Sequence, residues 1–521
     1  MRSFTRSVLI LAGLIGLPAA VHGQAAQASI VGVVRDTSGA VLPGVTVEAS
    51  SPALIEKIRT VVTDGAGQYR IESLRPGLYT VAFTLTGFNS VRREGIELAG
   101  SFVATVSPEM RVGSVEETVT VTGQSPIVDV QSATKQRVIG EDVLQSIPTG
   151  RTQFTAATLI PGMNLNNQDV GGTNIINTTG GSMTIHGSNG NDQRVMIDGL
   201  STANSELAGQ ASNFLPNMGS VQEMAVDFSS GTADQATGGV RINIIPRDGG
   251  NMFKGSLFAT GANSSFQADN YMTDLQARGL RTPNSVKMNY DINPGVGGPL
   301  QKDTLWFYGS ARWTKTQNFV GGMFYNRNAG IENVWTYDPD LSNPAYANAF
   351  QRSVNLRLTW QANQKNKFSF FVDDQGRCQC ANVAATTAPE AAISIEYPIQ
   401  RMMSVGWTSP RTNRVLLEAR AGFRGENYKY NAIPANDPAR RLITVTEQLS
   451  VNGAPAGLQY HGGGIGGQTA TQPYQNTYGR NIDFLASASY VTGTHALKFG
   501  FSDTVVLRNE SLDDNIYNVS Y

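Results

Sequence analysis

Cysteine and histidine are scarce in this sequence of 521 residues, which contains two cysteines and four histidines. The two cysteines, Cys378 and Cys380, are too few for a disulfide scaffold in a chain of this length. A local bridge across one residue and an unbridged loop position remain as alternatives. The histidines are scattered without the spacing of a metal site. We therefore predict no resident metal and no other cofactor.

An excess of charge of one sign is also lacking. The formal net charge is -1 at pH 7, and it becomes -3 without Arg2 and Arg6 near the N-terminus. This balance leaves no basic surface for nucleic acid, which we exclude as a partner. After residue 23 the sequence has no run of about 18 apolar residues, so it predicts no transmembrane helix there.

Catalytic motifs are absent as well. The sequence "GGGIGGQT" has the spacing of a phosphate-binding loop, but Gln468 stands where the lysine of that loop belongs. Ser132 and Lys135 match an SxxK pattern without its companion motifs. The sequence has no nucleophile elbow, paired carboxylates or dinucleotide fingerprint. We predict that the protein is not an enzyme.

The N-terminus has the order of a secretory signal. Arg2 and Arg6 precede an apolar stretch from Val8 to Ala20, and a candidate cleavage site ends at Gly23. The apolar stretch is short for a transmembrane helix, although an N-terminal membrane anchor is the alternative. We predict that residues 1–23 are a signal peptide and that the protein is exported.

Residues 28–110 show short strand patterns separated by turn sequences such as Asp-Thr-Ser-Gly and Asp-Gly-Ala-Gly. This pattern predicts a small β-sandwich. The expected core residues are Tyr69, Ile71, Leu78, Tyr79 and Phe83. The stretch that begins "GVVRDTSGAVLPGVTVEAS" resembles the carboxypeptidase regulatory-like domain, a transthyretin-like sandwich grouped with carbohydrate-binding-like folds. The resemblance implies no catalytic residue.

Residues 124–249 mix a short helical pattern with strand and turn signals. The two clearest signals are "QRVMIDGL" and "GGVRINIIPRDGG", and in the second Val240, Ile242 and Ile244 alternate with polar residues. These sequences resemble the plug domain of TonB-dependent outer-membrane receptors. The resemblance implies an α+β plug.

From residue 250 to residue 521 apolar and polar residues alternate in about nine segments. One example is Val354, Leu356, Leu358 and Trp360, which alternate with Asn355, Arg357 and Thr359. A soluble sandwich has the same alternation, but so do transmembrane barrel strands, which are apolar towards lipid and polar towards the lumen. We predict barrel strands whose longer loops, 261–283 and 435–475, are extracellular.

The order of these parts, with "GGPLQKDTLWFYGSARW", resembles the Oar-like branch of the TonB-dependent transporters. The predicted fold is mainly β: signal peptide, sandwich, plug, and the N-terminal part of an antiparallel transmembrane barrel. Barrels of this family have about 22 strands. About nine cannot close one, so we interpret the chain as a C-terminally truncated fragment, with completion by another chain as the alternative.

The stretch "EETVTVTG" at residues 116–123 resembles the TonB box. Its candidate interaction residues are Glu117, Thr118, Val119, Thr120 and Val121. Alternating β-branched residues favour an extended strand, which pairs with a partner by β-augmentation. We expect the strand to have no fixed partner within the chain. The alternatives are a linker and the last strand of the sandwich.

The resemblance implies TonB-dependent uptake of an unidentified ligand across the outer membrane, with a carbohydrate or a peptide as candidates. The expected partners are the periplasmic TonB complex and outer-membrane lipid. The alternative is a carbohydrate-binding or adhesive surface protein without transport. Trp306, Tyr308 and Trp407 are interpreted as aromatic residues of the membrane interface rather than as lumen platforms for a ligand.

Overall fold

Short strands and turns at the N-terminal end of the chain form the sandwich, as expected from the turn sequences. The computed structural model describes residues 28–520, except 52–53, 55–57, 75–76, 99–102, 114–117, 123–135, 148–149, 166–182, 204–213, 229–237, 269–272, 279–281, 332, 335, 382, 413, 433–443, 450–455, 462–473, 493–494 and 514–517. The predicted signal peptide and Glu117 therefore lie outside the described residues.

The sandwich contains one three-stranded sheet of order β5-β1-β8 and one five-stranded sheet of order β10-β7-β6-β3-β4. Its strands are β1 (Ala28–Val33), β2 (Arg35–Asp36), β3 (Thr46–Ser50), β4 (Ile58–Val62), β5 (Gln68–Leu74), β6 (Gly77–Thr84), β7 (Ser90–Leu98), β8 (Val103–Thr105), β9 (Glu109–Met110) and β10 (Thr118–Thr122). The short strands β2 and β9 pair with each other.

The sandwich has a hydrophobic core of its own, in which Tyr69 and Phe83 meet edge to face with ring centroids 5.4 Å apart. The Tyr69 hydroxyl donates a hydrogen bond of 2.7 Å to the Val106 carbonyl. Four of the five expected core residues are buried, but Leu78 is 61% exposed. The prediction for Leu78 is wrong because the alternation along β6 turns Tyr79, and not its neighbour, towards the core.

The next part is a small mixed domain, the plug. Its five-stranded sheet has the order β11-β16-β17-β14-β15, and β14 and β17 run parallel. Its elements are β11 (Gln136–Gly140), α2 (Glu141–Ser146), α3 (Gln153–Ala157), β12 (Met163–Leu165), β13 (Met183–Ile185), η2 (Gly190–Asp192), β14 (Arg194–Ile197), β15 (Leu200–Ser201), η3 (Met218–Ser220), β16 (Val221–Asp227) and β17 (Arg241–Pro246). Its core includes two residues of the following sheet, Phe371 and Met402.

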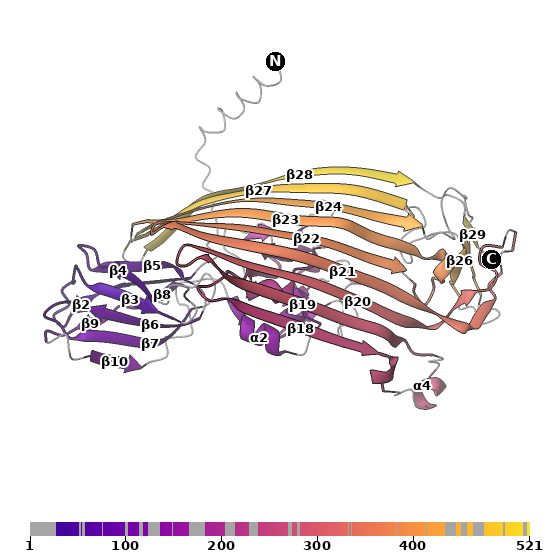
Figure 1. The fold of residues 1–521 in the computed structure, drawn as a ribbon, viewed down its shortest axis with the longest axis horizontal. Coiled ribbons are helices and arrows are strands. Elements are labelled where there is room, and N and C mark those ends of the chain that lie inside the picture. Colours follow the sequence, from indigo (N-terminus) through magenta and orange to yellow (C-terminus); the bar gives the residue numbers. More distant parts are fainter. Residues whose placement is uncertain are drawn as a thin grey trace, which may run out of the picture.

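Nine long antiparallel strands follow and form one open, curved sheet (Figure 1). They are β18 (Lys254–Asn263), β19 (Ser285–Gln301), β20 (Leu305–Asn326), β21 (Pro339–Asn363), β22 (Asn366–Ala381), β23 (Ile393–Thr412), β24 (Val415–Ala432), β27 (Tyr474–Thr492) and β28 (His495–Asp513). The connections between them also contain η4 (Ser264–Phe266), α4 (Thr273–Ala277), η5 (Pro389–Ala391), β25 (Thr444–Thr446) and β26 (Gln459–His461), and β29 (Asn518–Ser520) follows β28.

The predicted alternation is confirmed in this sheet. On β21, Val354 and Trp360 are 59% and 48% exposed, whereas Asn355 and Thr359 are buried against the plug side. We call the polar, plug-facing side the inner face. No helix among the described residues is long and apolar enough to cross a membrane.

The two ends of the sheet differ in the length of their connections. The β21–β22 and β23–β24 turns are short, whereas the β22–β23 and β24–β27 connections are long. In barrels of this kind the short turns are periplasmic and the long loops extracellular. The sandwich lies at the end of the sheet with the short turns (Figure 1).

The strand β10 contains four of the five predicted TonB-interaction residues. It pairs in parallel with β7, with partners running from Thr118 and Ser90 to Thr122 and Glu94. Our expectation that this strand has no partner within the chain is therefore wrong. The physical reason is that β7 presents an open edge beside β6, and an extended segment can satisfy its backbone groups there.

Candidate functional site: the plug–barrel interface

The plug is joined to the inner face by a buried guanidinium. Arg357 of β21 contacts carboxylates from two plug turns: its Nη1 pairs with Asp198, and its Nε lies 2.5 Å from Asp248 Oδ1. The side chains of all three are 8–11% exposed. The Thr359 hydroxyl donates a further hydrogen bond of 2.6 Å to Asp248. We call Arg357, Asp198 and Asp248 the Arg357 cluster.

The first of the two plug turns is set by local sequence. Asp198 and Gly199, with φ of 51° and 79°, form a two-residue loop between β14 and β15. Asp-Gly suits such a hairpin because both central residues need positive φ. The Asn243 side chain accepts a hydrogen bond of 2.8 Å from the Gly199 N–H, and Arg420 of β24 donates to the Asp198 carbonyl.

The second plug turn follows β17 in the sequence "PRDGG". Gly249 approaches β20 so closely that a Cβ atom there would lie 2.3 Å from the Phe307 carbonyl oxygen. A side chain at this position would push the turn, and with it Asp248, away from the inner face. The glycine therefore places Asp248 within reach of Arg357.

A cavity lies beside the Arg357 cluster. Its lining includes the three cluster residues, Lys367 and Arg420 from the barrel strands, and Leu74 from the sandwich. The Lys367 ammonium is 3.9 Å from Asp248. The cavity thus joins all three parts of the chain at one place.

Neutral hydrogen bonds attach the plug further along the inner face. Gln375 donates to the Leu215 carbonyl at 2.8 Å, and Asn217 donates to the Ser310 hydroxyl at 3.1 Å. Asn355 donates to the Ser220 hydroxyl at 3.2 Å. The polar half of the strand alternation is thus used to hold the plug.

Aromatic residues lie on the side of these contacts where the strands have their long connections. The guanidinium of Arg377 on β22 is 4.2 Å from the ring centroid of Tyr397, and the Tyr397 and Tyr428 rings are 5.8 Å apart. Arg377 is 2% exposed, and none of its three guanidinium nitrogens has a hydrogen-bond partner in the described part of the chain. Sequence reasoning missed this group because three strands contribute its members and only their register brings them together.

The predicted membrane-interface aromatics divide into two groups. Trp306 is buried and donates to Asn251 at 2.7 Å, while the Tyr308 hydroxyl donates to the plug carbonyl of Gly219 at 3.1 Å. The interface prediction is wrong for these two, because both alternate with the outward-facing residues of β20. Trp407 belongs to the second group. It pairs in register with Phe368, which stacks on the half-exposed Trp360, and its place at the membrane interface stays a prediction.

An ion pair joins the sandwich to the barrel strands. Arg414, in the turn between β23 and β24, lies 2.8 Å from Asp64 in the turn between β4 and β5. Partial burial raises the pKa of Asp64, but the N–H groups of Gln68 and Ala66 and the charge of Arg414 outweigh this effect. The net result is a pKa below the ordinary value, so Asp64 is ionised and available for pairing at neutral pH.

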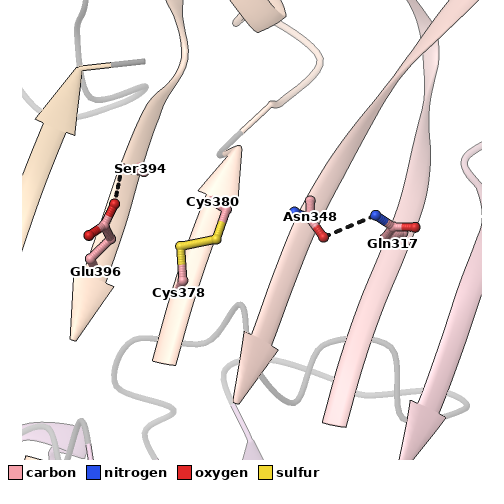
Figure 2. Close-up of a disulfide and its surroundings, with 6 residues drawn as sticks. All are labelled: Gln317, Asn348, Cys378, Cys380, Ser394 and Glu396. Atoms are coloured by element: carbon pink, nitrogen blue, oxygen red, sulfur yellow. Dashed lines mark hydrogen bonds between the residues drawn. A yellow bond between two sulfur atoms is a disulfide. The ribbon is translucent and has the colours of Figure 1, made fainter. Parts of the chain in front are cut away.

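The two cysteines form a disulfide with each other within β22, near the end of the strand that leads into the long β22–β23 connection (Figure 2). Of our two alternatives, the local bridge is confirmed and the unbridged loop position is wrong. Among the residues that the structure describes, no group of three or more His, Cys, Asp or Glu is arranged to hold a metal ion.

Two family models match the sequence. The carboxypeptidase regulatory-like domain matches residues 29–111, and the outer membrane beta barrel domain matches residues 327–516. The outer membrane transporter YddB from Escherichia coli has a similar structure, with a TM-score of 0.50 at 10% identity over 72% of this chain and 48% of that one. At this identity the likeness concerns the fold.

The large antiparallel sheet resembles the barrels of TonB-dependent receptors, and the chain belongs to the outer membrane. It is a homologue of the TonB-dependent transporter Oar from Myxococcus xanthus, with 30% identity over 388 residues. The alignment covers 70% of this chain and 34% of Oar, so the chain spans about a third of that relative's length. Oar and YddB are both transporters.

Proposed function

We propose that the protein containing this chain takes up a ligand across the outer membrane, and that TonB drives uptake by acting on β10. The observation that carries the proposal is the Arg357 cluster. It fixes a separate domain against the inner face of the sheet through groups buried from water. A transporter needs such a plug to keep its lumen closed, whereas an adhesive surface protein does not.

The proposed ligand is a carbohydrate or a peptide that carries a negative charge. Arg377 supports the charge because a buried guanidinium without a hydrogen-bond partner is costly, and an anionic group would compensate it. The neighbouring rings of Tyr397 and Tyr428 add a flat surface for an apolar or sugar face. The proposed role of the protein is not enzymatic.

Uptake by cells with and without TonB tests transport. Cells that express the full-length protein receive fluorescently labelled acidic oligosaccharides and acidic peptides. We expect one class to accumulate inside the cells only when TonB is present. Surface binding without accumulation, equal in both strains, would favour the adhesive alternative.

A pair of variants tests the assignment of β10. Val119→Pro removes a backbone donor and fixes φ near −65°, so we expect it to abolish binding of the purified periplasmic domain of TonB. Val119→Ala keeps the donor and changes strand preference on a scale of about 1 kcal/mol, so its effect should be much smaller. Equal binding by wild type and Val119→Pro would place the coupling strand elsewhere.

A further inference from the structure

The position of β10 in the sandwich has a consequence for its proposed partner. Five consecutive residues of β10 pair with β7, and β10 is the terminal strand in the order β10-β7-β6-β3-β4. In a paired strand, the backbone N–H and C=O groups that point to the neighbouring strand are already hydrogen-bonded to it. A partner that needs those groups must displace β7.

The pairing is of a kind that opens readily. Parallel pairs are slightly less stable per residue than antiparallel ones, and this pair is five residues long at the edge of a sheet. Short edge elements open locally at much lower free energy than the core does. Release of β10 therefore breaks only this one pairing and leaves the other strand pairs of the sandwich intact.

The sandwich that carries the acceptor edge is attached to the barrel strands through other elements, namely β5 and the turn between β4 and β5. Asp64 of the sandwich pairs with Arg414, and Leu74 reaches the cavity beside the Arg357 cluster. A docked β10 is thus part of a domain that lies at the end of the sheet with the short turns (Figure 1). The docked state keeps the segment that precedes the plug attached to the sandwich.

We infer that the β7 edge is a docking site for β10 that competes with TonB, so that the sandwich limits access to the coupling strand. The inference rests on the proposed role of β10 as that strand. TonB then binds only the free state, and its apparent affinity falls in proportion to the fraction of β10 that is free.

A reversible cross-link tests the competition in the full-length protein. Arg92 and Thr120 are register partners, and replacing both by cysteine places two thiols on neighbouring strands. Arg92 is half-exposed in an ion pair with Glu94, so its loss costs the sandwich little. The matched control is Glu48→Cys with Thr60→Cys, which are register partners on β3 and β4 in the same sheet.

We expect the Arg92→Cys/Thr120→Cys disulfide to form in the resting protein and to weaken binding of the periplasmic domain of TonB at least tenfold, with recovery after reduction. The control cross-link should leave binding unchanged. A cross-linked protein that binds TonB as tightly as its reduced form overturns the competition, and so does failure of the cross-link to form. If Val119→Pro also binds TonB normally, the assignment of β10 fails; if Val119→Pro abolishes binding, only the docking inference fails.

Discussion

Single residues at the plug–barrel interface differ mainly in how far they are removed from water. Asp198 and Asp248 pair with Arg357 at 8–11% side-chain exposure, whereas Glu141 pairs with Arg247 while 44% exposed. Buried pairs become strongly destabilising when one partner is removed, because the other charge stays buried. Exposed pairs contribute between about 0 and 1 kcal/mol.

Arg357→Gln should therefore loosen the plug. The change removes the cation that the two buried carboxylates share and leaves only Lys367, 3.9 Å from Asp248, so we expect a loss of about 3–5 kcal/mol in the free energy of plug opening. Hydrogen exchange of the β14–β15 amides in the full-length protein measures this free energy of plug opening. Glu141→Gln is the control, with an expected loss below about 1 kcal/mol. Unchanged exchange in Arg357→Gln would show that the cluster does not anchor the plug.

At the scale of elements, the strand pattern was predictable and the pairing of remote segments was not. The nine barrel strands follow from the period-two alternation of apolar and polar residues. Burial alternates in the same way on strands that cover the plug, such as β21, whereas β18 is exposed on both faces along most of its length. The partner of β10 did not follow, since backbone pairing leaves no mark on the side chains. The Arg357 cluster was also missed, although the sequence indicated both plug turns. The sequence of a barrel strand does not show which of its inner-face residues contacts a plug turn.

The sandwich offers a test of its own core. Phe83 is fully buried against Tyr69, so Phe83→Ala should cost about 3–5 kcal/mol in an expressed fragment of residues 28–113. Leu78→Ala is the matched control on the same strand; its 61% exposure predicts a change within about 0.5 kcal/mol. Urea unfolding measures both. A fragment that is disordered by NMR would contradict the independent core.

For the whole molecule, the open sheet is the dominant feature. Within the described residues, β18 and β28 each have one neighbour in the nine-stranded sheet, so both outer edges lack partners. Unpaired backbone groups cost several kcal/mol each in hydrocarbon, and open edges recruit other strands. The architecture of the family is thus present here without closure.

We expect residues 24–521, refolded alone in detergent, to associate into oligomers on size-exclusion chromatography. The full-length protein, treated in the same way, should elute as a monomer and should float with outer membranes after cell fractionation. A monodisperse monomer of residues 24–521 would mean that the edges are covered in a way the nine strands do not show. Recovery of the full-length protein in the soluble periplasm would contradict the barrel.

The Cys378–Cys380 bridge has a consequence for biogenesis. It closes a ring over a single intervening residue, so it restricts the unfolded chain very little and its value for stability is small. The bond requires an oxidising compartment, however, which an exported chain meets only after it leaves the cytosol. The redox state of this pair therefore distinguishes chains before and after export. We expect the two thiols to react with an alkylating reagent in chains that are still in the cytosol. In chains that have crossed the inner membrane the sulfurs should be unreactive.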